Sequence, residues 1–174
     1  MLTRRDVMWT GGTLLAGLPL LSAQAAGSDI VEITMHGNTD GSVVWFDPQG
    51  VLVRPGQTVR WTNRDPGNSH TSTAYHPMND GHPLRIPPGA QPWNSDYLLP
   101  DQSFEAVLNA PGVYDYFCIP HEHAGMVGRL VVVEQGTSVP APPVGSPIEE
   151  LEADPFPAVE EIMRQGRVTL PRAG

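Results

Sequence analysis

The sequence predicts an all-β domain folded as a sandwich of two sheets, and three observations support this expectation. Short stretches in which apolar and polar residues alternate recur along the chain, as in 31–36, where Val31, Ile33 and Met35 are the apolar members. Gly, Pro, Asn and Asp residues, which form turns, separate these stretches. No convincing helical pattern occurs before residue 140. Many short strands separated by turns are typical of a β-sandwich.

Alternation also predicts which side chains face the core. The predicted strands cover 31–36, 43–46, 58–62, 103–109, 114–118 and 130–133. In 114–118, Tyr114, Tyr116 and Cys118 share one face of the strand, while Phe117 points to the other face. We therefore expect Cys118 to lie inside with the tyrosines and Phe117 to point outward.

Length and composition fit one domain with appended segments. The chain has 174 residues, of which 40% are hydrophobic, and this suits a single sandwich core. It contains one cysteine, Cys118, so no intramolecular disulfide can form. The net charge of −9 argues against nucleic acid as a partner, because phosphate binding needs a basic surface. An acidic chain instead favours a protein partner with a basic docking surface.

Residues 1–25 have the pattern of an export signal. Arg4 and Arg5 precede an apolar segment, 9–21, that is too short to span a membrane, and Ala25 ends a motif of small residues at which cleavage is expected. The paired arginines favour the twin-arginine pathway, with a Sec signal or an uncleaved anchor as alternatives. We expect a periplasmic protein without stable membrane insertion.

Four residues with metal-binding side chains occur in a pattern that predicts one metal site. Cys118, His121 and Met126 lie in a single turn-rich loop, and His70 follows a strand-like stretch upstream. A thiolate and two imidazoles with a long thioether contact are the ligand set of a blue-copper site. Taken singly, each residue is more simply explained as a core or loop residue. Zinc is the nearest alternative metal, but structural zinc prefers four strong cysteine or histidine ligands.

The segments around these residues resemble the small cupredoxins of the plastocyanin, amicyanin and pseudoazurin group. The resemblance covers roughly residues 29–134 and rests on 51–63, 111–121 and 124–128, with their flanking glycines and aromatic residues. One departure is Thr71, where the family usually has Asn after the first histidine ligand. The resemblance implies a cupredoxin-like Greek-key β-sandwich that holds one mononuclear type 1 copper ion.

The resemblance also implies roles for individual residues. His70, Cys118 and His121 would be the strong copper ligands, Met126 would be the weak axial ligand, and Asn63 would tie the two ligand loops together. The implied function is transfer of single electrons between redox protein partners, by a monomer that is not an enzyme. A copper carrier or buffer that delivers copper to an exported enzyme is the alternative. A copper redox enzyme is a weaker one, because the sequence shows no further metal cluster.

Small and apolar residues surround His121 in the ligand loop, among them Pro120 and Ala124. They predict a flat patch suited to brief docking of a redox partner, with the ring edge of His121 at its centre. Phe117, next to Cys118, is the alternative route by which electrons leave.

A segment rich in Pro, Gly, Asn and His, 71–100, is predicted to be a loop. His76 and His82 in this segment, together with His123, are candidates for an accessory metal site. Scattered surface histidines are commoner than such sites, and no spacing here supports a cluster.

The chain is thus expected to comprise a signal peptide at 1–25, a copper-binding domain at 26–136, and a Pro-rich linker with an acidic tail at 137–174. Capping and amphipathic patterns predict short helical turns at 146–149 and 157–166. Composition leaves open whether this tail is unfolded, packs on the sandwich or binds a partner.

Overall fold

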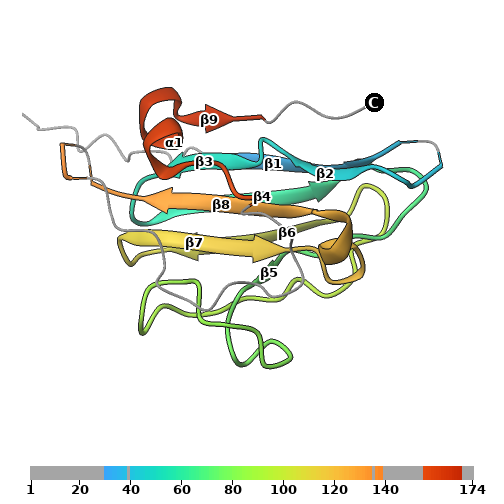
Figure 1. Ribbon diagram of the computed structural model, residues 1–174, viewed down its shortest axis with the longest axis horizontal. Coiled ribbons are helices and arrows are strands. Elements are labelled where there is room, and N and C mark those ends of the chain that lie inside the picture. The colour runs from blue at the N-terminus through green and yellow to red at the C-terminus, as the bar shows by residue number, and fades with distance from the viewer. Residues whose placement is uncertain (1–29, 39, 135, 139–154, 170–174) are drawn as a thin grey trace, which may run out of the picture.

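The computed structural model describes residues 30–38, 40–134, 136–138 and 155–169. These residues form two facing β-sheets, so the predicted two-sheet sandwich is confirmed (Figure 1). In this part of the chain, no helix is long and apolar enough to cross a membrane. The expected signal peptide lies outside the described residues, as does the helical turn expected at 146–149.

The first sheet has four strands in the order β2-β1-β4-β6. They are β1 (Val31–Gly37), β2 (Val44–Asp47), β4 (Gln57–Asn63) and β6 (Ser103–Leu108). β1 pairs in parallel with β4 and antiparallel with β2, and β4 pairs antiparallel with β6. Burial alternates along β1 as the sequence predicts, because its apolar side chains face the second sheet.

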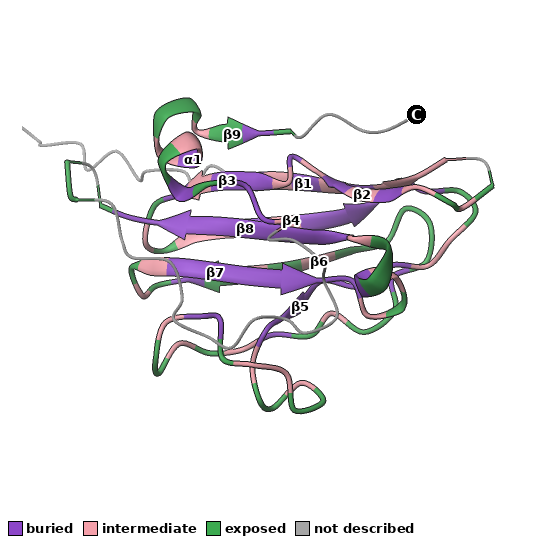
Figure 2. Cartoon of the chain, viewed as in Figure 1, coloured by how far each residue is buried: buried purple, intermediate pink, exposed green. Residues whose placement is uncertain are grey.

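The second sheet has five strands in the order β5-β7-β8-β3-β9. They are β3 (Gly50–Val53), β5 (Thr73–Ala74), β7 (Gly112–Phe117), β8 (Val127–Val132) and β9 (Arg167–Val168). Consecutive strands from β2 to β7 alternate between the two sheets, so the chain crosses the sandwich repeatedly. Every residue of β8 is buried, and so is all of β7 except its first residue, which shows that both faces of this sheet are covered (Figure 2).

The main core lies between the sheets and is rich in aromatic side chains. Trp61 and Tyr116 are both fully buried and meet edge to face, with ring centroids 5.5 Å apart. Gly128 on β8 makes room for this arrangement, since a Cβ there would overlap the ring and hydroxyl of Tyr116. Cys118 belongs to the same buried cluster as Tyr114 and Tyr116, as the alternation of the strand predicted.

Residues 155–169, called here the C-terminal segment, pack against the outer side of the second sheet. The segment contains the helix α1 (Val159–Gln165), within the helical turn predicted at 157–166, and then the strand β9, which pairs with β3 (Figure 1). Val159 and Ile162 join Val113 and Val131 in a second apolar cluster. The segment therefore packs on the sandwich, one of the outcomes that composition left open.

The expected outward orientation of Phe117 needs correction. Phe117 does lie on the face of β7 opposite Cys118, but it is only 1% exposed because Tyr75, Val127 and Phe156 cover it. The odd or even position of a residue along a strand identifies the face on which its side chain lies. Whether that face meets solvent depends on the segments that cover it.

Candidate metal centre

The four predicted metal-binding residues lie at one end of the sandwich, on two loops. His70 follows β4 and forms a β-bridge with Leu98, and Cys118 follows β7 directly. His121 lies in the short 3₁₀ helix η1 (Ile119–Ala124), and Met126 precedes β8. Because both loops start from strands of the packed sandwich, the rigid framework fixes where each side chain begins.

Three of these side chains converge on one point. The distance between the Nδ1 atoms of His70 and His121 is 3.1 Å, and the Cys118 Sγ lies 3.6 Å from the first and 3.4 Å from the second. In the described chain this is the single group of three or more His, Cys, Asp or Glu donors able to hold a metal ion. His70 and Cys118 are fully buried, whereas His121 is partly exposed. Met126 is fully buried in the same core cluster as Cys118.

Hydrogen bonds fix the cysteine and the loop around it. The Thr71 amide donates to the Cys118 Sγ at 3.2 Å, and the Thr71 hydroxyl accepts from the Ile119 amide at 2.9 Å. The Cys118 amide donates to the Met126 carbonyl, and the Met126 amide donates to the His121 carbonyl. Thr71, the position that departs from the family pattern, thus joins the two ligand loops directly.

A buried carboxylate orients the first histidine. The Asp65 Oδ2 lies 3.0 Å from the His70 Nε2, so His70 can donate there while its Nδ1 faces the cysteine. Burial favours a raised pKa for Asp65, but bonds from Asn68, Gly67 and His70 outweigh it and lower the pKa. Sequence reasoning missed Asp65, because an Asp followed by Pro is also an ordinary turn signal.

Asn63, which the resemblance implied would tie the two ligand loops together, supports the His70 loop. Its Nδ2 donates to the carbonyls of Asn68 and Leu98, and its Oδ1 accepts from the Asp65 amide. These bonds hold the turn that carries Asp65 and the segment that pairs with His70. Asn63 therefore acts on the His70 loop, and these bonds lead to the cysteine loop only through Asp65 and His70.

A second buried acid, Glu122, lies between the two histidines of the ligand loop. Its Oε1 accepts from the Tyr75 hydroxyl at 2.7 Å, and its Oε2 lies 3.0 Å from the His82 Nε2. Burial and the neighbouring carboxylate raise the pKa of Tyr75, which keeps its hydroxyl protonated as a donor. Glu122 thus ties the ligand loop to the 71–100 segment, a role that its sequence neighbours did not signal.

Burial shifts the pKa values of the three donor side chains. Burial raises the pKa of the Cys118 thiol to about 12. Burial also lowers the pKa of His70, despite Asp65 beside it, and burial together with His70 lowers the pKa of His121. All three donors are therefore uncharged near pH 7 in the absence of a cation. A metal ion would stabilise the thiolate, and neutral imidazoles are ready to bind it.

The donor set fits a copper ion. Three donors around one ion, each bonded at about 2.0–2.3 Å, lie some 3.5 Å apart, which matches the separations of the three atoms here. A thiolate with two imidazoles suits copper, since soft sulfur stabilises Cu(I) and imidazole tolerates both oxidation states. The residues present thus agree with the expected cofactor.

Two other features lie apart from this centre. His82 bonds to Glu122, whereas the His76 Nδ1 accepts from the Met78 amide, and the described chain does not gather them with His123 into a metal-binding group.

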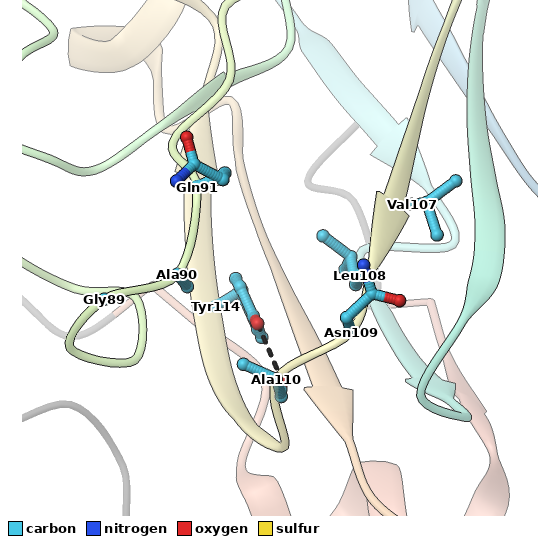
Figure 3. A pocket seen from close by; sticks show the side chains of 8 residues that line it. All are labelled: Gly89, Ala90, Gln91, Val107, Leu108, Asn109, Ala110 and Tyr114. Carbon is cyan, nitrogen blue, oxygen red and sulfur yellow. Dashed lines mark hydrogen bonds between the residues drawn. The ribbon is translucent and has the colours of Figure 1, made fainter.

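A pocket between residues 89–91, the end of β6 and Tyr114 is lined by uncharged side chains (Figure 3). It lies toward the end of β7 that is remote from Cys118.

The sequence is similar to those of known copper-binding proteins. The family model of copper binding proteins, plastocyanin/azurin family, matches residues 32–133. A chloroplastic plastocyanin of Tetradesmus obliquus is 35% identical over 128 residues, covering 72% of this chain and 80% of its own length. A pseudoazurin of Methylorubrum extorquens is 28% identical over 118 residues, covering 67% of this chain and 70% of its own. A solved purple cupredoxin from Nitrosopumilus maritimus is 26% identical with a TM-score of 0.45, covering 59% of this chain and 99% of that one. The chain belongs to the plastocyanin/azurin family of copper-binding proteins.

Proposed function

We propose that this protein is an electron carrier that holds one type 1 copper ion and alters no substrate chemically. The observation that carries the proposal is the convergence of His70, Cys118 and His121 at one end of a packed sandwich. The family relationship supports copper as the cofactor. When bound, the copper would supply one-electron redox chemistry.

The proposed ligands are His70, Cys118 and His121, with Met126 as a weak axial ligand. Fast electron transfer requires a site that changes little in shape between oxidation states. Two hydrogen bonds supply that rigidity, because they hold two ligand side chains from outside the site: the Thr71 amide donates to Cys118, and His70 donates to Asp65.

A copper carrier or buffer is the alternative function. A carrier must release its metal readily to an acceptor, whereas three of the four proposed ligands here, His70, Cys118 and Met126, are fully buried. The hydrogen bonds that fix them also oppose opening of the loop. Burial and rigidity therefore favour the electron carrier.

The visible and electron-paramagnetic-resonance spectra of the copper-loaded protein test the proposal. We expect an intense blue colour and one copper per chain, and Cys118→Ser should remove the colour because it removes the thiolate. Met126→Leu should keep the colour and shift the reduction potential, because it removes a weak ligand only. Copper bound at one per chain without a strong thiolate band would refute the type 1 assignment.

We further propose that residues 1–25 direct the protein to the periplasm by the twin-arginine route, leaving a copper-binding domain at 26–136 and a tail at 137–174. The arginine pair and the short apolar segment support this. Replacing Arg4 and Arg5 together with lysine should retain precursor in the cytoplasm. Undiminished periplasmic protein would instead indicate Sec export.

The proposed partners are redox proteins with a basic docking surface, which meet a monomeric carrier at the exposed side of His121. Pro120 and Ala124 are exposed beside this partly exposed ring. A charge introduced by Ala124→Asp should slow electron transfer to such a partner while the copper spectrum stays unchanged. An unchanged rate would exclude this patch as the docking surface.

A further inference from the structure

The ring of Phe156 occupies a site built from two buried arginines and a tyrosine. The guanidinium carbons of Arg85 and Arg129 each lie 4.9 Å from the ring centroid. Tyr75 meets the ring edge to face, with centroids 5.9 Å apart and an interplanar angle of 77°. Phe156 itself is 7% exposed. Cation–π and edge-to-face contacts of this kind favour one position of the ring over others.

The backbone on either side of Phe156 is fixed as well. The Pro155 carbonyl accepts from the Gln49 Nε2, and the Pro157 carbonyl accepts from the Arg129 Nη1, both at 3.0 Å. The proline rings restrict the backbone further. The chain therefore delivers the Phe156 ring to this site with little conformational freedom.

The Phe156 ring belongs to a small apolar cluster that is separate from the main core. Its other members are Tyr75, Phe117 and Val127, with Ile119 packed against them. Phe117 and Ile119 flank the proposed ligand Cys118, and Val127 follows the proposed ligand Met126. Both ends of the ligand loop, residues 118–126, thus rest on the cluster that Phe156 completes.

A hydrogen bond extends this support to the middle of the loop. Tyr75, which contacts Phe156 and Phe117, donates its hydroxyl to Glu122, the neighbour of His121. The support therefore reaches the start, the middle and the end of the ligand loop.

We propose that Phe156 is a positioning residue for the copper site, and that through it the C-terminal segment holds the ligand loop closed. Phe156 lies beyond residues 32–133, the region that matches the family model. Removing its ring leaves a cavity under Phe117 and Val127, and a cavity at a loop's base lowers the free energy of local opening. The inference rests on the proposed ligand set.

Phe156→Ala tests the proposal in the full chain. In the copper-free protein, amide hydrogen exchange of residues 118–126 should quicken by about tenfold, a loss of about 1.4 kcal/mol of local stability. In the copper-loaded protein, release of copper to an excess of a strong chelator should quicken by a similar factor. Phe156→Leu, which retains apolar volume but loses the aromatic face, should give a smaller change and serves if the alanine variant does not fold.

Ile162→Ala provides the matched control. Ile162 is fully buried in the same C-terminal segment, but it packs with Val113 and Val131 rather than with the ligand-loop cluster. We expect this variant to lower thermal stability without a selective change in exchange of residues 118–126. Equal quickening in both variants would overturn the role of Phe156 itself, and no quickening in Phe156→Ala would overturn the coupling altogether.

These outcomes are separate from those that test the proposed function. A wild-type protein without a blue copper spectrum would refute the ligand assignment, whatever the exchange data show. Conversely, a blue wild-type protein whose loop exchange is insensitive to Phe156 would refute the positioning role alone.

Discussion

The two sides of β7 bury polar groups in opposite ways. On the inner side, the thiol of Cys118 meets two imidazoles, and all three are uncharged until a cation arrives. On the outer side, the fully buried Asp115 carboxylate pairs with Arg85 and Arg129 at 2.7 Å each. The chain thus supplies both the negative and the positive groups of the outer cluster. In the inner site it supplies only the proposed ligands, and the positive charge comes with the metal ion. The inner site is therefore complete only when a cation binds, while the outer cluster is complete once the chain folds.

The largest effect is expected from breaking the outer cluster with Asp115→Asn. This change leaves two buried guanidinium groups without their carboxylate, which typically costs about 3–5 kcal/mol. Chemical denaturation of the copper-free protein should show this loss. Asp101→Asn, which breaks the exposed pair with Arg64, is the control and should cost no more than about 1 kcal/mol. Similar losses in both variants would mean that burial does not distinguish the two pairs.

A second prediction concerns the charge state of the inner site. The raised pKa of Cys118, about 12, means that copper must displace one proton from the thiol near neutral pH. The lowered pKa values of His70 and His121 mean that the imidazoles are already neutral there. The apparent copper affinity should therefore increase about tenfold for each pH unit between pH 7 and pH 9. Competition titrations against a chelator of known pH dependence would measure this, and a flat profile would show that Cys118 gives up no proton.

The smallest effect is expected from Asp65→Asn, which removes one buried charge beside the inner site. The lowered pKa of Asp65 keeps it ionised near pH 7, where its charge favours the more positive copper state. Asparagine can still accept from the His70 Nε2 through its one amide oxygen, at the cost of the bond that the Gly67 amide donates to the other Asp65 oxygen. We expect the reduction potential to rise by roughly 60 mV, a tenfold change in the one-electron equilibrium. Voltammetry would measure the shift, and a lower potential would contradict this electrostatic role.

The inner site was readable from the sequence, and the outer cluster was not. Cys118, His121 and Met126 fall in one short loop, and their chemistry is distinctive enough to predict a partner such as His70. Alternation also located β1, β2, β4, β6 and β7, whose apolar side chains face the core. It did not indicate β3, β9 or the short strand β5, which lies in the 71–100 segment predicted to be a loop. Local patterns of this kind can be recognised in the sequence, because they depend only on the spacing of nearby residues.

The outer cluster depends instead on contacts between distant residues. Asp115 lies 30 residues from Arg85 and 14 from Arg129, and no spacing rule connects them. The position of Phe156 could not be predicted for the same reason, because a phenylalanine between two prolines forms no sequence pattern that indicates its contacts. Phe117 is buried because distant residues such as Phe156 cover it, so its position in the strand alone could not predict its burial.

The pairing of β9 with β3 has a consequence for the behaviour of the molecule in concentrated solution. Without β9, the strand β3 would end the second sheet and present unpaired amide and carbonyl groups along an apolar strand. The Leu52 amide donates instead to the Gly166 carbonyl, and the Gln49 amide to that of Val168. Exposed edges of this kind recruit strands from other chains. With this edge covered, the second sheet ends in the two-residue strand β9, and such a short edge strand is a poor template for pairing with another copy of the chain.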